Sequence, residues 1–169
     1  MFLWFLGLSF LGVFVVFRDP AIDHRMVMLG AVAPIAVDLV TPGYAPAHTL
    51  LGAVLLLGFV MVATHGRRHL RRRLIGFSIG VFFHLILDLT WTREVLFWWP
   101  LLGTKVDTPG FGAYDRPIYL LAIMELVGAA VLYWAYRRFN LSDARLREDF
   151  MRTGHLDREL MGPGEPPSC

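Results

Sequence analysis

The segment His65–Thr90 reads HGRRHLRRRLIGFSIGVFFHLILDLT, so a basic run leads directly into an apolar stretch. From Leu74 to Thr90 only His84 and Asp88 are ionisable. At a rise of ~1.5 Å per residue this stretch covers roughly 25 Å, close to the thickness of the hydrocarbon core of a bilayer. Arginines beside an apolar stretch are typical of a cytoplasmic loop. The segment therefore predicts a transmembrane helix that begins at an arginine-rich cytoplasmic turn.

The composition of the whole chain agrees with this prediction. Of its 169 residues 56% are hydrophobic and 18% are charged, and the mean hydropathy is +0.53. A soluble domain carries roughly 25% charged residues and is less apolar. The formal net charge of +2 is too small to indicate a nucleic-acid partner. Because Cys169 is the one cysteine, the chain can form neither an internal disulfide nor a thiolate metal cluster.

Four more apolar stretches predict four more spans, so the expected fold class is an all-α polytopic transmembrane helix bundle of about five spans. The predicted spans are Met1–Phe17, Met26–Val40, His48–Thr64, Leu74–Thr90 and Pro117–Tyr136. The first span lacks the basic start and the small-residue cleavage site of a signal peptide, so it is expected to be retained. The second span is short and contains Pro34, so it either crosses the membrane, re-enters it or packs inside the bundle. Trp91–Arg116 is expected to be a long loop.

The arginines predict the orientation of the bundle. Basic segments lie at Arg18–Arg25, Arg67–Arg73 and Arg137–Arg138, and the alternation of five spans places all three on one side. The positive-inside rule makes that side cytoplasmic. The prediction is a multi-pass cell-membrane protein, with its N-terminus outside, its C-terminus in the cytoplasm and the lipid bilayer as its immediate partner.

The chain divides into a predicted bundle at residues 1–136 and a polar C-terminal tail at residues 137–169. Alternating charges in the tail predict a short amphipathic helix, which Asn140 or Ser142 would cap. The sequence after Met161, GPGEPPSC, is expected to be disordered because it is rich in proline and glycine.

The functional signal is a set of ionisable residues inside the predicted spans. These residues are Asp38, His48, His84, Asp88 and Glu125. Each costs ~2.5–3.5 kcal/mol in a hydrocarbon core, so such residues persist where they are paired, hydrated or functional. The orientation derived from the arginines places all five in the outer half of the membrane. We therefore expect a site that opens toward the outer leaflet.

The spacing of residues in the fourth span directs part of this set into the bundle. His84 and Asp88 are four residues apart and share a helix face. Gly76 and Gly80 precede them on the same stripe, and small residues at this spacing let a second helix approach closely. The His84 and Asp88 side chains are therefore expected to face the bundle interior and not the lipid.

Two imidazoles with two or three carboxylates are a ligand set that suits Zn²⁺ or Mn²⁺, and Fe²⁺ also fits. A metal with an open coordination position lowers the pKa of a bound water to about 7. The predicted metal ligands are Asp38, His48, His84 and Asp88, and Glu125 is the predicted general base. The structural alternative is that His84 and Asp88 only hydrogen-bond each other and that Glu125 only neutralises a neighbour.

Other polar residues have simpler interpretations. His24 lies with Asp23 at the cytoplasmic end of the second span and is expected to be interfacial and not a ligand. Asp107, Asp115 and Arg116 lie in the predicted outer loop, where they either close over the site or are simply exposed charges.

The ordered set of motifs resembles the YdjM/DUF457 family of membrane-bound metal-dependent hydrolases. The chain reads GAVAPIAVD at Gly30–Asp38, HT at His48–Thr49, HLILD at His84–Asp88 and WP at Trp99–Pro100. The order and spacing agree with the family over Leu29–Leu102, about half of the chain. The resemblance implies a helical membrane fold, a hydrolase activity, and metal ligands at the aspartate and histidine positions of these motifs.

Two positions depart from the family pattern. Ile35 follows Pro34 where the family usually has aspartate, and Pro46–Ala47 stands where the family often has histidine and arginine. The loss of an acidic ligand implies a weaker site, one metal in place of two, or no activity.

The expected function is a metal-dependent hydrolase whose outer-leaflet site acts on a lipid-linked or envelope substrate. A phosphoester fits because a metal neutralises the charge that develops on phosphoryl oxygens. One alternative is an ion, metal or proton pathway through the same buried groups, and another is a non-catalytic membrane protein whose tail recruits a cytoplasmic partner. A pathway needs polar groups that continue to the cytoplasmic half, and the third and fifth spans offer none there, which favours the enzyme.

Overall fold

The computed structural model describes residues 1–19, 22–40, 45–103 and 116–156. Within these ranges the chain is helical and contains no strand. The α-helices are α1 (Phe2–Phe17), α2 (His24–Val40), α3 (Leu50–Ala63), α4 (Arg68–Leu87), α5 (Glu94–Phe97), α6 (Ile118–Arg138) and α7 (Ala144–Thr153), and the 3₁₀ helices are η1 (Ala45–His48) and η2 (Thr90–Thr92). Each of the five predicted apolar stretches forms a long helix, which confirms the all-α class.

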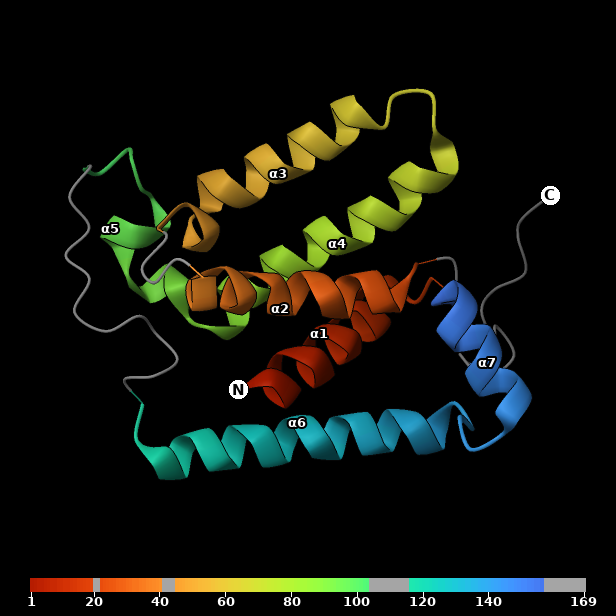
Figure 1. Cartoon of the computed structure of the whole chain (residues 1–169). Coiled ribbons are helices and arrows are strands. Elements are labelled where there is room, and N and C mark those ends of the chain that lie inside the picture. The colour runs from red at the N-terminus through yellow and green to blue at the C-terminus, as the bar shows by residue number, and fades with distance from the viewer. Residues whose placement is uncertain (20–21, 41–44, 104–115, 157–169) are drawn as a thin grey trace.

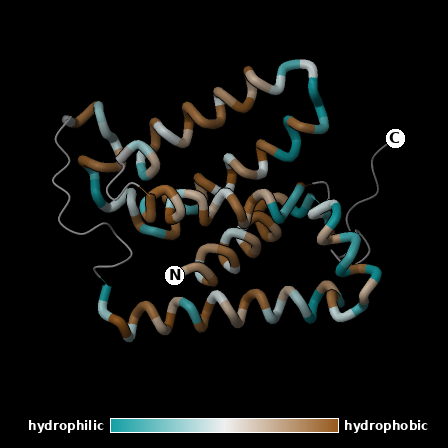
Figure 2. Tube along the Cα trace, in the orientation of Figure 1, coloured by the Kyte–Doolittle hydropathy of each residue, from teal (hydrophilic) through white to brown (hydrophobic). Residues whose placement is uncertain are grey.

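The five long helices run lengthwise beside one another, and α7 lies across one end (Figure 1). α2 packs against α4, α1 packs against α6 and α2, and α3 packs against α4. The arginine-rich turn between α3 and α4 lies at the same end as α7, and we call this the basic end. η1, η2 and α5 lie at the opposite end, which we call the site end. Figure 2 shows apolar residues along the helices and hydrophilic residues at both ends, among them the arginine-rich turn and α7 at the basic end.

Glycines bring the backbones of α2 and α4 into direct contact. A Cβ atom on Gly80 would fall 2.0 Å from the Val27 carbonyl oxygen, and one on Gly30 would fall 2.0 Å from the Phe77 carbonyl oxygen. No side chain other than hydrogen fits at either position. The close approach predicted from Gly76 and Gly80 is therefore confirmed, and α2 is the helix that approaches.

One helix of the described residues, α6, is long and apolar enough to cross a membrane by itself. α1 and α3 are apolar but contain only 16 and 14 residues. The five-span membrane bundle expected from the sequence thus stays a prediction.

Two local predictions need correction. The tail helix α7 is capped by Asp143, whose side chain accepts from the Arg145 N–H at 2.8 Å. Neither predicted cap is used, because the Ser142 hydroxyl donates to the Asn140 side chain (3.0 Å) and Asp143 directly precedes the helix. The expected long loop Trp91–Arg116 contains η2 and α5 in its described part.

At the basic end, the side chain of Asp23 is 2% exposed and joins several neighbouring groups. Arg25 donates to both of its oxygens (3.2 and 3.1 Å), Arg73 of α4 donates to Oδ2 (3.3 Å) and the Met26 N–H donates to Oδ1 (3.4 Å). Burial acts to raise the pKa of Asp23, but the hydrogen bonds and the charge of Arg25, together with the Met26 and Arg73 contacts, lower this pKa below its ordinary value of 3.8. Asp23 is therefore a saturated, ionised carboxylate.

Gly154 fixes α7 to this carboxylate. It ends α7 with a φ of +73°, a left-handed conformation that favours glycine, and a Cβ there would fall 1.7 Å from Asp23 Oδ1. Its carbonyl oxygen accepts from the His24 N–H at 2.9 Å. The segment that follows joins a buried apolar cluster of Phe10, Ala135, Phe139 and Leu156.

Candidate metal centre

His84 faces the interior of the bundle from α4. Its Nδ1 lies 2.8 Å from the Ala31 carbonyl oxygen of α2, and its ring stacks on Phe5 of α1 with 4.3 Å between centroids. A carbonyl can only accept, so in the neutral ring Nδ1 carries the proton and Nε2 presents its lone pair. Nε2 is buried and has no hydrogen-bond partner among the described residues. Metal-binding histidines are commonly held in this way, with the other ring nitrogen bonded to a carbonyl.

His48 is placed by the junction of η1 and α3. It ends η1, and the next residue, Thr49, caps α3 by accepting from the Gly52 N–H at 2.9 Å. The His48 side chain is buried, and its ring centroid lies 5.3 Å from that of His84. Its Nε2 lies 3.3 Å from Oδ2 of Asp38, which comes from the end of α2. Asp38 Oδ1 is buried and has no hydrogen-bond partner within the described ranges.

Asp88 directly follows α4, and its side chain is 10% exposed. Arg116 donates to its main-chain carbonyl at 2.9 Å and lies 3.5 Å from Oδ1, while the Thr90 hydroxyl lies 3.4 Å from Oδ2. Each carboxylate oxygen thus has a contact at the long limit of a hydrogen bond. His84 does not bond Asp88, because Ala31 takes its Nδ1 and its Nε2 has no partner in the part described.

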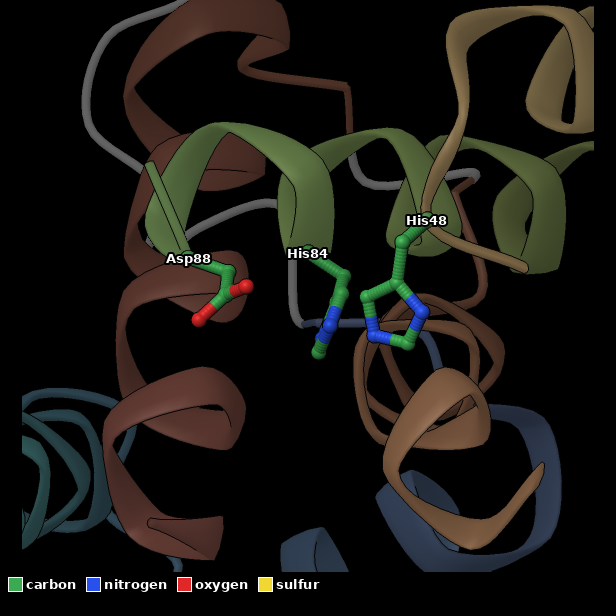
Figure 3. Close-up of side chains that lie close together, drawn as sticks. All are labelled: His48, His84 and Asp88. Atoms are coloured by element: carbon green, nitrogen blue, oxygen red, sulfur yellow. The ribbon is translucent and has the colours of Figure 1, made fainter. Parts of the chain in front are cut away.

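The side chains of His48, His84 and Asp88 project into the same space (Figure 3). One ligand atom from each lies within 4.8 Å of the others. Ligand atoms around a tetrahedral zinc lie about 3.4 Å apart, so small side-chain rotations would close this set on an ion. Two imidazole nitrogens and a carboxylate oxygen also form the ligand set of known catalytic zinc sites with an open position. The group could therefore hold a metal ion.

Glu125 lies outside this group. Its Oε1 lies 2.7 Å from the amino nitrogen of Met1, and its Oε2 accepts from the Leu3 N–H at 3.0 Å. The first N–H groups of a helix have no partner within the helix itself, and Glu125 of α6 satisfies one of them for α1. This arrangement agrees with the structural alternative for Glu125, a carboxylate that neutralises a neighbour.

Ile35 is buried with Phe5 and Ala31 in an apolar cluster. It adds an apolar side chain and no ligand atom. The stacking of Phe5 on His84 could not be predicted from the sequence, because a phenylalanine in an apolar stretch has the same pattern whether it faces lipid or a site. Arg116, one of the three charges of the predicted outer loop, contacts Asp88. The other two, Asp107 and Asp115, lie outside the described residues.

The fold and the His48–His84–Asp88 group define the class of protein. Over its described residues, the chain is a helical protein with a group that could hold a metal ion. All three side chains of the group were among the residues expected at the site. A search against family models, curated proteins and solved structures finds no match for the chain.

Proposed function

We propose that this chain is a multi-pass membrane protein that acts as a metal-dependent hydrolase, with its site near the outer leaflet. The observation that carries the proposal is the convergence of His48, His84 and Asp88, with the His84 Nε2 buried and unpartnered among the described residues. The resemblance to the YdjM/DUF457 family supports it, because these three residues and Asp38 stand at the family's motif positions.

The exposed surface of the helices supports the membrane part of the proposal. The apolar window of α6 is only 17% buried, and Phe59 of α3 and Leu126 of α6 are each 70% exposed. A core helix of a soluble protein would instead be mostly covered, and so much exposed apolar surface is stable in a bilayer. The short helices α1 and α3 would cross by local thinning of the bilayer. The basic end would face the cytoplasm.

Zn²⁺ or Mn²⁺ in this group would polarise a substrate oxygen and activate a water near neutral pH. The chain supplies the remaining roles. Asp38 contacts His48 and has one oxygen unpartnered within the described ranges, so we assign it the proton-accepting role that the sequence suggested for Glu125. Because Ile35 offers no ligand atom, we infer one metal ion and not two. A site near the outer leaflet favours a lipid-linked or envelope substrate.

An ion or proton pathway through the same groups is the alternative, and the buried hydroxyls argue against it. Ser9 of α1 donates to the Leu6 carbonyl oxygen (3.3 Å), and Ser78 of α4 donates to the Leu74 carbonyl oxygen (3.2 Å). Both hydroxyls are thus engaged within their own helices and do not extend a relay from His84 toward the basic end.

The test is the metal content of the detergent-purified chain, measured by elemental analysis beside the His84→Ala/Asp88→Ala double variant. We expect close to one Zn²⁺ or Mn²⁺ per wild-type chain and a loss of at least tenfold in the variant. A screen of phosphoester and lipid substrates would follow on the loaded protein. Absence of metal from the wild type after reloading would contradict the hydrolase and favour a polar packing cluster or a relay.

A further inference from the structure

Arg116 lies beside the candidate metal group, and its side chain is 16% exposed. It stands two residues before α6 and reaches the end of α4, where one of its terminal nitrogens donates to the Asp88 carbonyl at 2.9 Å. The other terminal nitrogen lies 3.5 Å from the Met124 sulfur. Arginine is rarely buried to this extent unless its guanidinium has a binding partner, because removing its charge from water is costly.

The main chain, and not the carboxylate, is the stronger anchor of this guanidinium. The bond to the Asp88 carbonyl oxygen is 2.9 Å, whereas the contact with Asp88 Oδ1 is 3.5 Å. A metal that draws the Asp88 carboxylate toward itself would therefore leave Arg116 in place. A guanidinium presents five N–H donors in a planar fork, so it can keep its carbonyl bond and still grip an oxyanion.

The charge balance of the site end favours an anionic ligand. The Arg116 guanidinium lies 3.5 Å from the Asp88 carboxylate, and Asp38, which contacts His48, is the second carboxylate beside the group. A divalent cation and the Arg116 guanidinium together outweigh the two carboxylates of Asp38 and Asp88. The occupied site would carry a net positive charge, which attracts anions and repels cations.

We propose that Arg116 binds the phosphoryl group of the substrate, so that the substrate class of this site is a phosphoester and not a carboxylic ester or an amide. This inference rests on the proposed function. A phosphoryl group offers charged oxygens to a guanidinium fork in the ground state, whereas the carbonyl of an ester or an amide is neutral. During hydrolysis the water oxygen bonds to phosphorus and gives up one proton to Asp38, the ester P–O bond breaks, and the leaving alkoxide takes up that proton to become an alcohol. Arg116 forms no covalent bond and holds the phosphoryl oxygens throughout.

The experiment uses the full chain in detergent, loaded with Mn²⁺, because this ion strongly speeds the ³¹P relaxation of any phosphate bound next to it. The probes are inorganic phosphate in one arm and a short-chain phosphatidic acid in the other. We expect relaxation enhancement by the wild type and a drop of at least fivefold in Arg116→Gln, with manganese content unchanged. The matched control is Arg137→Gln, which removes an exposed arginine at the opposite end of α6 and should leave the enhancement unchanged.

The outcomes separate the two levels of inference. Equal enhancement by wild type and Arg116→Gln, at equal manganese content, would overturn the role of Arg116 and leave the metal centre standing. No manganese in the wild type would overturn both. Should Arg116→Gln itself lose manganese, Arg116→Lys keeps the charge without the planar fork, and undiminished enhancement in that variant would overturn the proposal. Arg116-dependent enhancement of either probe supports it, and the probe that responds identifies a lipid-linked or a free phosphate.

Discussion

Asp23 and His24 at the basic end can be set against Asp38 and His84 at the site end, since each pair combines an aspartate and a histidine with buried polar atoms. The Asp23 oxygens accept from two arginines and a main-chain N–H. By contrast, Asp38 Oδ1 and His84 Nε2 have no hydrogen-bond partner among the described residues. His24 Nε2 also lacks one in that part of the chain, but the ring beside it is that of Phe10, 5.2 Å away between centroids.

The two ends contain the same residue types, and they differ in whether several potential ligand atoms lie close together. A buried carboxylate whose oxygens all accept hydrogen bonds is compatible with the folded state, and it has no capacity left for a ligand. At the site end, ligand atoms of His48, His84 and Asp88 lie within 4.8 Å of one another, and His84 Nε2 is buried without a partner among the described residues, which is costly unless something binds there. The basic end is therefore a closed ion-pair cluster around Asp23, whereas the group at the site end could hold a metal ion.

The largest effect should come from exchanging the two histidines in turn for asparagine. The asparagine amide can keep the bond that Nδ1 makes, to the Ala31 carbonyl from His84 and to the Ile22 carbonyl from His24, but it has no Nε2. We expect His84→Asn to weaken metal binding by at least ~100-fold. His24→Asn should keep full metal content, measured by the same elemental analysis. Equal metal loss in both variants would mean that the two ends do not differ as described.

The next effect concerns the backbone contact that carries His84. Gly80→Ala would place a methyl group 2.0 Å from the Val27 carbonyl oxygen, so α2 and α4 must separate, at a cost of about 3 kcal/mol. Gly58→Ala on α3 is the matched control, because a Cβ there has nothing within 4 Å. That change should be neutral or stabilise the helix by up to ~1 kcal/mol. Unfolding followed by tryptophan fluorescence in detergent measures both, and equal stabilities would refute the close contact.

A smaller effect is expected at the ion-pair cluster around Asp23. Asp23→Asn removes the charge that Arg25 and Arg73 share, which should lower the free energy of unfolding by about 2 kcal/mol and leave metal content unchanged. Arg73→Gln should cost less than ~1 kcal/mol, because that arginine is 56% exposed. Loss of metal in Asp23→Asn would show that the two ends are coupled.

The smallest effect is a pH dependence. The pKa of Asp23 is lower in the folded protein than its ordinary value of 3.8, so the folded state favours the ionised form. The contribution of Asp23 is complete above that value and is lost as pH falls below it, through the folded pKa. We expect wild-type stability to decline below about pH 4 more steeply than that of Asp23→Asn. Parallel acid titrations of the two proteins would show that Asp23 makes no such contribution.

Much of the fold could be predicted from hydropathy alone. Predominantly apolar runs located all five long helices, and the stripe of Gly76 and Gly80 identified the face of α4 that a second helix approaches. Short-range details were less predictable, because competing local hydrogen bonds decide them. Asn140, Ser142 and Asp143 are all plausible caps, and the mutual bond of the first two leaves Asp143 as the cap.

The candidate site was predictable where residues share an element and less so where they do not. His84 and Asp88 follow from their spacing on one helix. Glu125 shows what the sequence cannot predict. Its depth in α6 can be read from the sequence, but the rotation of α6 about its own axis cannot. That rotation directs the Glu125 carboxylate toward the start of α1. Arg116 likewise depends on how a loop returns to the bundle, which no periodicity records.

The contact between α2 and α4 at Gly30 and Gly80 has a consequence for how this protein can vary. Main-chain atoms alone set the spacing of these two helices there, so the Ala31 carbonyl meets the His84 imidazole at a height that no side chain adjusts. The packing of the two backbones therefore determines which ring nitrogen of His84 carries the proton. Substitutions of outward-facing side chains on both helices should leave this tautomer unchanged. A single methyl group added at Gly80, one turn before His84, would disturb it.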